Sequence, residues 1–163
     1  MRAGVVRAGI MRIGVISDTH GLLRPEAVTA LRGVDHILHA GDVGNIQILD
    51  SLRTLAPVTA IRGNIDRTGP CAQLPPTEFI ELAGHSLYML HDLAALDLDP
   101  SAAGIAAVIS GHSHKPGIER RKGVLYFNPG SAGPRRFSLP ISLGFLEIDA
   151  HGITPQLVEL SVQ

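Results

Sequence analysis

The chain has 163 residues, 45% of them hydrophobic, and a formal net charge of −1. This length suits one domain with a substantial core, and the composition excludes a disordered chain. The near-neutral charge gives no global reason to expect nucleic acid as a partner, and no apolar stretch reaches the roughly 18 residues of a membrane span. The single cysteine, Cys71, excludes an internal disulfide and a thiolate metal cluster. It is typical of a reducing compartment, so we expect a cytoplasmic protein without a membrane partner.

The first ten residues, MRAGVVRAGI, precede a second methionine at position 11. They are too short to hold both the charged and the apolar region of a secretory signal. We interpret residues 1–10 as a frayed leader or a mis-assigned start. Residues 11–163 are expected to form a single domain.

Short apolar runs rich in valine and isoleucine predict β-strands along the first two thirds of the chain. They occupy residues 12–17, 35–40, 58–61, 79–83, 86–90 and 106–110. Two helical patterns separate the first three runs. One covers residues 24–33, with Pro25 in its first turn, and the other covers residues 45–56, with Asn45 as its cap. This alternation predicts right-handed βαβ units and a parallel sheet.

The second half of the chain predicts three β-hairpins. Their turns fall at Ala83-Gly84, near Lys122-Gly123, and at residues 149–152, DAHG. Together with the first half, they predict an α/β fold of two stacked mixed β-sheets flanked by helices, with antiparallel strands in the second half.

Metal-binding residue types follow five of the predicted strands, mostly beside a glycine. They are Asp18, His20, Asp42, Asn64, His91, His112 and His114. Ligands of open α/β sheets bind beyond the carboxyl ends of the strands, so we expect these seven side chains to converge in one cleft. Taken singly, several of them also fit an ordinary turn or cap. Their joint occurrence at five strand ends favours a metal site.

Seven oxygen and imidazole donors are too many for one metal ion that keeps an open position, but they suit two divalent ions. Asp42 is the natural bridge, because a carboxylate has two oxygens. Such ion pairs activate a bridging water and hold both oxygens of an in-line phosphoryl displacement. The histidines and the lack of sulfur favour Mn, which we expect first, or Fe, Zn, Ni or Co, over a pure Mg site.

The motifs that carry these residues resemble those of the calcineurin-like metallophosphoesterase superfamily. They are D-x-H, GD, GN-x-D, H and GHxH, in this order, and NPGS at residues 128–131 resembles the small YfcE-type phosphodiesterase branch. The resemblance implies a four-layer αββα sandwich. It also implies one metal held by Asp18, His20, Asp42 and His114, and another held by Asp42, Asn64, His91 and His112. A water or hydroxide between the ions would attack phosphorus, and a small phosphodiester would be the substrate.

Two positions depart from the pattern of many superfamily members. Ile65 stands where many carry a histidine after the GN pair, a histidine that the YfcE-type branch also lacks, and Asp92 stands where many have glycine. The missing histidine weakens general acid catalysis, a contribution typically worth about 10²–10⁴-fold. We therefore expect substrates with good leaving groups, modest rates or another proton donor.

Other functions are less favoured by the sequence. A non-catalytic scaffold like the retromer subunit Vps29 shares the expected fold, but its site is degraded, whereas all seven donors are intact here. A nuclease would normally have a broad basic groove, which this charge balance does not offer. The sequence is compatible with an oligomer and does not decide the oligomeric state.

Further polar residues invite interpretation. We expect Asp66 to support the site or cap a helix rather than bind metal. His39 either orients a ligand from below or is a simple buried histidine. The NPGS segment is a turn that lines the cleft only by family similarity. We interpret Arg135 and Arg136 as a solvated pair rather than a phosphate clamp, and Cys71 as a loop residue rather than a nucleophile. The remaining histidines are expected to be structural or solvated, namely His36, His85 and His151.

Overall fold

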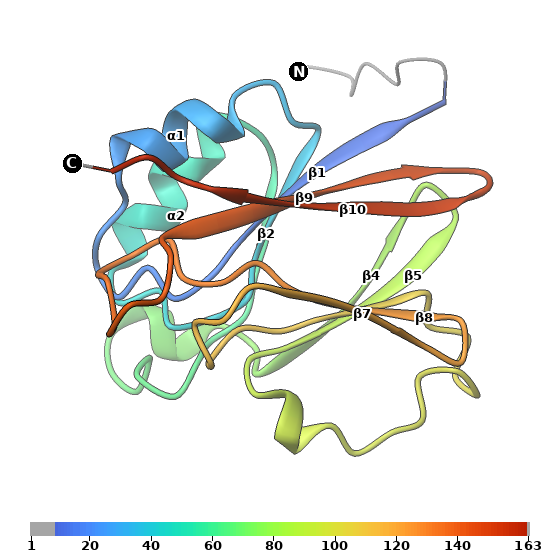
Figure 1. The fold of residues 1–163 in the computed structure, drawn as a ribbon. Coiled ribbons are helices and arrows are strands. Elements are labelled where there is room, and N and C mark those ends of the chain that lie inside the picture. Colours follow the sequence, from blue (N-terminus) through green and yellow to red (C-terminus); the bar gives the residue numbers. More distant parts are fainter. Residues whose placement is uncertain (1–8, 163) are drawn as a thin grey trace.

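Two five-stranded sheets stack face to face in the computed structural model, which describes residues 9–162 (Figure 1). The first sheet contains β1 (Met11–Ile16), β2 (His36–His39), β3 (Val58–Ala60), β9 (Ser142–Asp149) and β10 (Gly152–Glu159). The second contains β4 (Thr77–Leu82), β5 (His85–Leu90), β6 (Ala107–Ile109), β7 (Gly117–Arg121) and β8 (Val124–Asn128). Their spatial orders are β10-β9-β1-β2-β3 and β4-β5-β6-β8-β7. Residues 1–8, most of the segment interpreted as a leader, lie outside the described residues.

The βαβ units predicted for the first half are present. Strands β1, β2 and β3 pair in parallel, and they are connected through α1 (Pro25–Leu31) and α2 (Ile46–Arg53). Helix α2 begins where the sequence predicts, because the Asn45 side chain accepts a hydrogen bond of 2.9 Å from the Gln47 N–H. None of the helices within residues 9–162 is long and apolar enough to cross a membrane.

The three predicted hairpins are also confirmed, as β4–β5, β7–β8 and β9–β10. The first turn has φ of 50° at Ala83 and 82° at Gly84, and the second has 50° at Lys122 and 78° at Gly123. Positive φ at both central residues matches the twist of the flanking strands, which is why a glycine stands second in each turn. The parallel pairs β5–β6 and β6–β8 make the second sheet mixed as well.

The core has three apolar layers. One lies between the sheets and includes Val15, Leu38, Met89, Ile109 and Phe127. The second packs α1 and α2 against the outer face of the first sheet, and the third covers the outer face of the second sheet. This third cover is thinner than the helical one, because it comes from the segment around the short 3₁₀ helix η2 (Leu93–Ala95). The predicted fold class is confirmed, with both α-helices on one side (Figure 1).

Candidate metal centre

The candidate ligands gather where the parallel strands of the two sheets end. Asp18 follows β1, Asp42 follows β2, and His91 directly follows β5. Asp18, Asp42, His91 and His114 are buried and His20 is partly buried. Asn64 and His112 are exposed and lie at the rim of this cluster.

Backbone geometry sets five of the seven residues apart. Their φ angles lie in the left-handed region, at 55° for Asp18, 46° for His20, 55° for Asp42, 72° for His112 and 62° for His114. Such conformations cost about 1–3 kcal/mol each in a non-glycine residue and persist where the surroundings over-determine them. Here the turns are bonded to each other, since the Asp18 N–H donates to the Gly41 carbonyl at 3.0 Å and the His20 N–H to the Asp42 carbonyl at 2.9 Å. This concentration of strain points to a functional site independently of the residue types.

The first tight group consists of Asp18, His20 and His114. Asp18 Oδ1 lies 3.7 Å from His20 Nε2 and 3.5 Å from His114 Nε2, and the two imidazole nitrogens are 3.3 Å apart. Two nitrogens bound to one tetrahedral ion at about 2.1 Å would lie roughly 3.4 Å apart. The separation of the two histidines therefore fits a shared ion.

The second tight group consists of Asp18, Asp42 and His91. His91 Nε2 lies 3.2 Å from Asp42 Oδ2 and 3.7 Å from Asp18 Oδ1. The other ring nitrogen, Nδ1, lies 2.7 Å from the Ala40 carbonyl oxygen, which can only accept a hydrogen bond. Nδ1 must therefore carry a proton, and in the neutral ring the Nε2 lone pair faces the two carboxylates.

Asn64 and His112 extend this second group to the surface. His112 Nδ1 lies 3.1 Å from Asn64 Oδ1, and its ring packs edge-on to the His91 ring at a centroid distance of 5.2 Å. His112 Nε2 lies 3.7 Å from Asp92 Oδ2. Asp92, at which the sequence departs from many relatives, is thus beside the centre.

The buried polar atoms at the centre fit divalent cations. Asp18 Oδ1, His91 Nε2 and His114 Nδ1 are buried and have no hydrogen-bond partner. Two buried carboxylates among acceptor nitrogens need positive charge between them, because burying unpaired charge is costly. The two His/Asp groups offer oxygen and nitrogen ligands that could each hold one divalent ion, and such ions would supply this charge.

The charge state of the centre follows the same pattern. Burial tends to raise the pKa of Asp18, but the neighbouring imidazoles of His20 and His91 outweigh it and hold that pKa below its usual value. Asp42 behaves likewise, with His91 and the Ile65 N–H opposing the effect of burial. Burial tends to lower the pKa of His91, yet the Asp42 carboxylate raises it above its usual value. Without metal, a proton on His91 supplies part of the missing positive charge.

His39 holds the two strand-end turns together from below. Its Nδ1 accepts from the Gly41 N–H at 3.2 Å, and its Nε2 lies 3.0 Å from Thr19 Oγ1. Thr19 in turn donates to the Val43 carbonyl at 2.9 Å. Of the two interpretations left open by the sequence, the structure favours a supporting role, although His39 hydrogen-bonds to no candidate ligand side chain.

Asp66 joins the loops after β2 and β3. Its carboxylate accepts from the N–H groups of Val43 at 3.1 Å, Gly44 at 3.0 Å and Gly63 at 2.8 Å. Every one of these contacts is to backbone, which agrees with the expected supporting role. Sequence reasoning missed two similar supports: Ser17 Oγ donates to Asp18 Oδ2 at 2.7 Å, and Ser131 Oγ donates to the Asp18 carbonyl at 2.9 Å. Ser17 ends the first predicted strand and Ser131 the NPGS segment, but serine is too common at such places to signal this.

Two glycines of the motifs are required by close packing. A Cβ atom at Gly63 would overlap the Asp42 carboxylate, and one at Gly111 would overlap the Ser17 hydroxyl. Neither glycine has a positive φ, so space rather than backbone conformation selects glycine here.

The other residues singled out from the sequence have supporting or peripheral places. Asn128 accepts from the Gly130 N–H at 2.9 Å and donates to the Gly111 carbonyl at 3.0 Å, so the NPGS turn contacts the GHSH loop. Arg135 donates to the Leu139 carbonyl at 3.2 Å within its own loop. The positive charge of Arg136 adds to burial in lowering the pKa of His114.

Cys71 lies in the 3₁₀ helix η1 (Pro70–Gln73) rather than in an open loop. It is buried, and burial raises the pKa of its thiol, which disfavours a nucleophile, as expected. His36 and His85 have structural partners, with His36 Nε2 2.8 Å from Thr59 Oγ1 and His85 Nε2 2.7 Å from the Asp149 carbonyl. His151 is exposed.

Solved structures of similar fold include a phosphodiesterase and several Vps29 proteins. An archaeal phosphodiesterase superposes with a TM-score of 0.73 at 23% identity, covering 91% of this chain and 100% of that one. Wild-type Vps29 of Entamoeba histolytica, solved in complex with Zn²⁺, superposes with a TM-score of 0.70 at 25% identity, covering 93% and 100%. The fold alone therefore does not separate catalysis from scaffolding.

Matches in sequence identify the family of this chain. A probable metallophosphoesterase of Methanocaldococcus jannaschii is 39% identical over 139 residues, which are 77% of this chain and 70% of that protein. A probable metallophosphoesterase of Methanothermobacter thermautotrophicus is 36% identical over 160 residues, or 91% and 92%. Residues 11–151 match the calcineurin-like phosphoesterase superfamily domain. With its two His/Asp groups at the strand ends, the chain belongs to the calcineurin-like phosphoesterase superfamily.

Proposed function

We propose that the protein is a dinuclear metal-dependent phosphodiesterase. The observation that carries this proposal is the buried Asp18 Oδ1, which has no hydrogen-bond partner although the Nε2 atoms of three histidines surround it at 3.5–3.7 Å. Divalent cations between these atoms would satisfy both the carboxylate and the imidazole lone pairs.

The ligand sets proposed for the two ions follow the family pattern. The first ion is assigned to Asp18, His20, Asp42 and His114, and the second to Asp42, Asn64, His91 and His112. The position of Asp42 Oδ2, 3.4 Å from His20 Nε2 and 3.2 Å from His91 Nε2, supports a carboxylate shared by both ions. When bound, a pair of divalent ions supplies an activated water for in-line attack and neutralises charge on the phosphoryl oxygens. Manganese is the first expectation for both.

Backbone N–H groups of the chain orient the two carboxylates. The Ile65 N–H donates to Asp42 Oδ1 at 3.1 Å, which fixes one carboxylate oxygen and leaves the other facing the histidines. The His112 N–H donates to Asp18 Oδ2 at 3.1 Å and does the same for Asp18. Both carboxylates are thus oriented in advance, which lowers the reorganisation needed on binding.

Leaving-group protonation is the weak part of this centre. The Ile65 side chain is 43% exposed and has no proton to give, although its position after Asn64 is where many superfamily members place a histidine. We therefore expect aryl diesters, whose leaving groups need little protonation, to react faster than alkyl diesters.

The alternative is a metal-binding scaffold of the Vps29 kind. Because one Vps29 has been solved with Zn²⁺, metal binding alone does not separate the two functions. Turnover does. The net charge of −1 also disfavours nucleic acid as the substrate, and the cytoplasmic location stays a prediction.

The test is hydrolysis of bis(p-nitrophenyl) phosphate by protein stripped with a chelator, before and after addition of Mn²⁺. Asp42→Asn removes the shared charge, and the amide retains the shape and tolerates the positive φ. Asp50→Asn, on the exposed surface of α2, is the matched control. We expect Mn²⁺ to restore turnover in the wild type and in the control, and not in Asp42→Asn. Absence of turnover with every divalent ion tried, despite metal binding, would favour the scaffold.

A further inference from the structure

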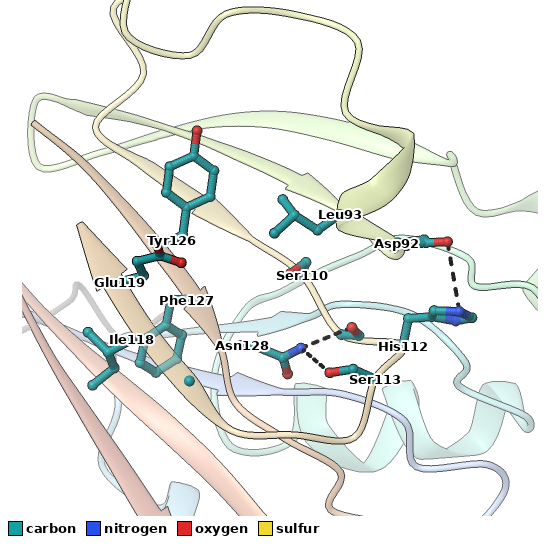
Figure 2. A pocket seen from close by; sticks show the side chains of 12 residues that line it. Asp92, Leu93, Ser110, His112, Ser113, Ile118, Glu119, Tyr126, Phe127 and Asn128 are labelled. Carbon is teal, nitrogen blue, oxygen red and sulfur yellow. Dashed lines mark hydrogen bonds and ion pairs between the residues drawn. The ribbon is translucent and has the colours of Figure 1, made fainter. Parts of the chain in front are cut away.

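A pocket of about 320 Å³ opens beside His112, on the outer face of the second sheet (Figure 2). Ser110 at the end of β6 and Tyr126 and Asn128 on β8 line it, and Leu93 of η2 lies across from them. We call this cavity the Tyr126 pocket. His112 and Asp92 line the same pocket, so it is continuous with the rim of the metal centre.

The chemistry of this pocket suits an uncharged ring. The Leu93 side chain and the half-buried Tyr126 ring supply apolar surface, while Ser110 and Asn128 supply a few polar groups. Its lining contains no lysine or arginine, and its two charged residues are the carboxylates Asp92 and Glu119. Pockets that are mainly apolar with a few polar groups are typical of sites for small organic groups. An anionic group would find no cation in this lining, because the guanidinium of Arg121, 4.6 Å from the centroid of the Tyr126 ring, lies outside it.

A second pocket, of about 440 Å³, lies on the other side of the same rim. It is lined by Asn64 and His91 of the centre and by Arg62 and Tyr88, and it shares Asp92 and His112 with the first. The shared rim therefore stands between two pockets that both reach the centre. A phosphodiester has two ester arms that diverge from phosphorus, whereas a monoester has one, so this arrangement matches a diester.

We infer that the Tyr126 pocket binds one ester arm of the substrate, and that this arm carries an uncharged ring. The inference rests on the proposed phosphodiesterase function and specifies its substrate class. Leu93 and Tyr126 are specificity residues in this proposal, because they contact the arm and lie outside the proposed ligand sets. A ring fills apolar surface that a methyl arm leaves in water, and one such difference in a pocket is worth about tenfold or more in kcat/KM.

The test compares p-nitrophenyl phenyl phosphate with p-nitrophenyl methyl phosphate as substrates of the Mn²⁺-loaded protein. Binding of diphenyl phosphate and dimethyl phosphate, measured by calorimetry, gives a second readout that does not depend on turnover. Leu93→Ala removes the apolar wall, and Leu93→Trp fills the pocket. Leu55→Ala is the control, since Leu55 is a partly buried leucine like Leu93, packs in the helical layer on the first sheet and lines neither pocket.

We expect the wild type and Leu55→Ala to favour phenyl over methyl arms in both readouts. Both Leu93 variants should lose about tenfold of that preference. Their Mn²⁺ affinity should match the wild type, which shows that the centre is intact. Equal use of both arms by the wild type, or full preference in the Leu93 variants, would overturn the inference while turnover persists. No turnover of either ester by the wild type would overturn the phosphodiesterase function, and this inference with it.

Discussion

The buried His39 makes stability depend on pH in a way that the structure allows us to work out. Burial lowers the pKa of His39 from its ordinary 6.5 to about 4. The neutral ring is required, because Nδ1 accepts the Gly41 N–H and so has no room for a proton of its own. We predict that acidification destabilises the fold, because protonation of His39 would break its hydrogen bond with the Gly41 N–H.

The sign follows from the two protonation states. In the unfolded chain His39 takes up a proton near pH 6.5, but in the folded protein it does so only near pH 4. Between these values the unfolded state binds more protons, so stability falls as the pH falls and is complete above pH 6.5. Lowering the pKa of His39 from 6.5 to about 4 corresponds to about 3 kcal/mol of folding free energy. The ring is fully buried, so solvent screening does not reduce this value.

The assay is urea unfolding of metal-free protein, followed by far-ultraviolet circular dichroism at several pH values between about 4.5 and 7.5. His39→Gln cannot titrate, and its amide can still donate to Thr19. We expect the variant to be less stable at neutral pH by about 1–3 kcal/mol, since the Gly41 N–H loses its partner. Its stability should also depend less on pH than that of the wild type, by up to about 1.4 kcal/mol per pH unit. The carboxylates and His91 titrate in both proteins and largely cancel in this comparison. Identical slopes would refute the reasoning.

Three further predictions concern the metal centre. Mn²⁺ affinity should fall as the pH falls below the raised pKa of His91, by up to about tenfold per pH unit for one displaced proton, and pH-independent calorimetric titrations would contradict this. Mn²⁺ at a hundred times its Kd should stabilise the protein by about 2.7 kcal/mol, seen as a higher Tm, and an unchanged Tm in the wild type would count against a native-state site. Gly111→Ala should destabilise the fold by about 1–3 kcal/mol through overlap with Ser17, whereas Gly117→Ala, where a Cβ meets nothing within 4 Å, should change urea unfolding much less; equal effects would refute the packing argument.

Local patterns determined the elements of this protein. Alternating apolar runs and a capping residue such as Asn45 act within a few residues of sequence, and so do the turn pairs Ala83-Gly84 and Lys122-Gly123. For this reason the strands, helices and hairpins agree with the sequence to within a few residues. The convergence of ligand residue types at one edge also followed, because parallel strands bring their carboxyl ends together.

Only the tertiary structure decided how the seven candidate residues are distributed. Asp18 belongs to both tight groups, whereas the family resemblance assigned it to one metal only. Asn64 and His112 lie at the rim. These differences arise from the left-handed turns that aim each side chain, and such turns depend on hydrogen bonds between segments far apart in sequence.

The sequence suggested supporting roles for His39 and Asp66, but the atoms they contact and the existence of the Tyr126 pocket were out of its reach. His39 and Asp66 act through backbone groups of other loops, and nothing in their neighbouring residues specifies those partners. The pocket exists because η2 packs over the second sheet, which brings Leu93 opposite Tyr126 across a long interval of chain. The sequence by itself determined which residue types stand at the strand ends and hence the family and its chemistry. The packing of distant segments decided which atoms are left without partners, and therefore where we propose that cations and a substrate bind.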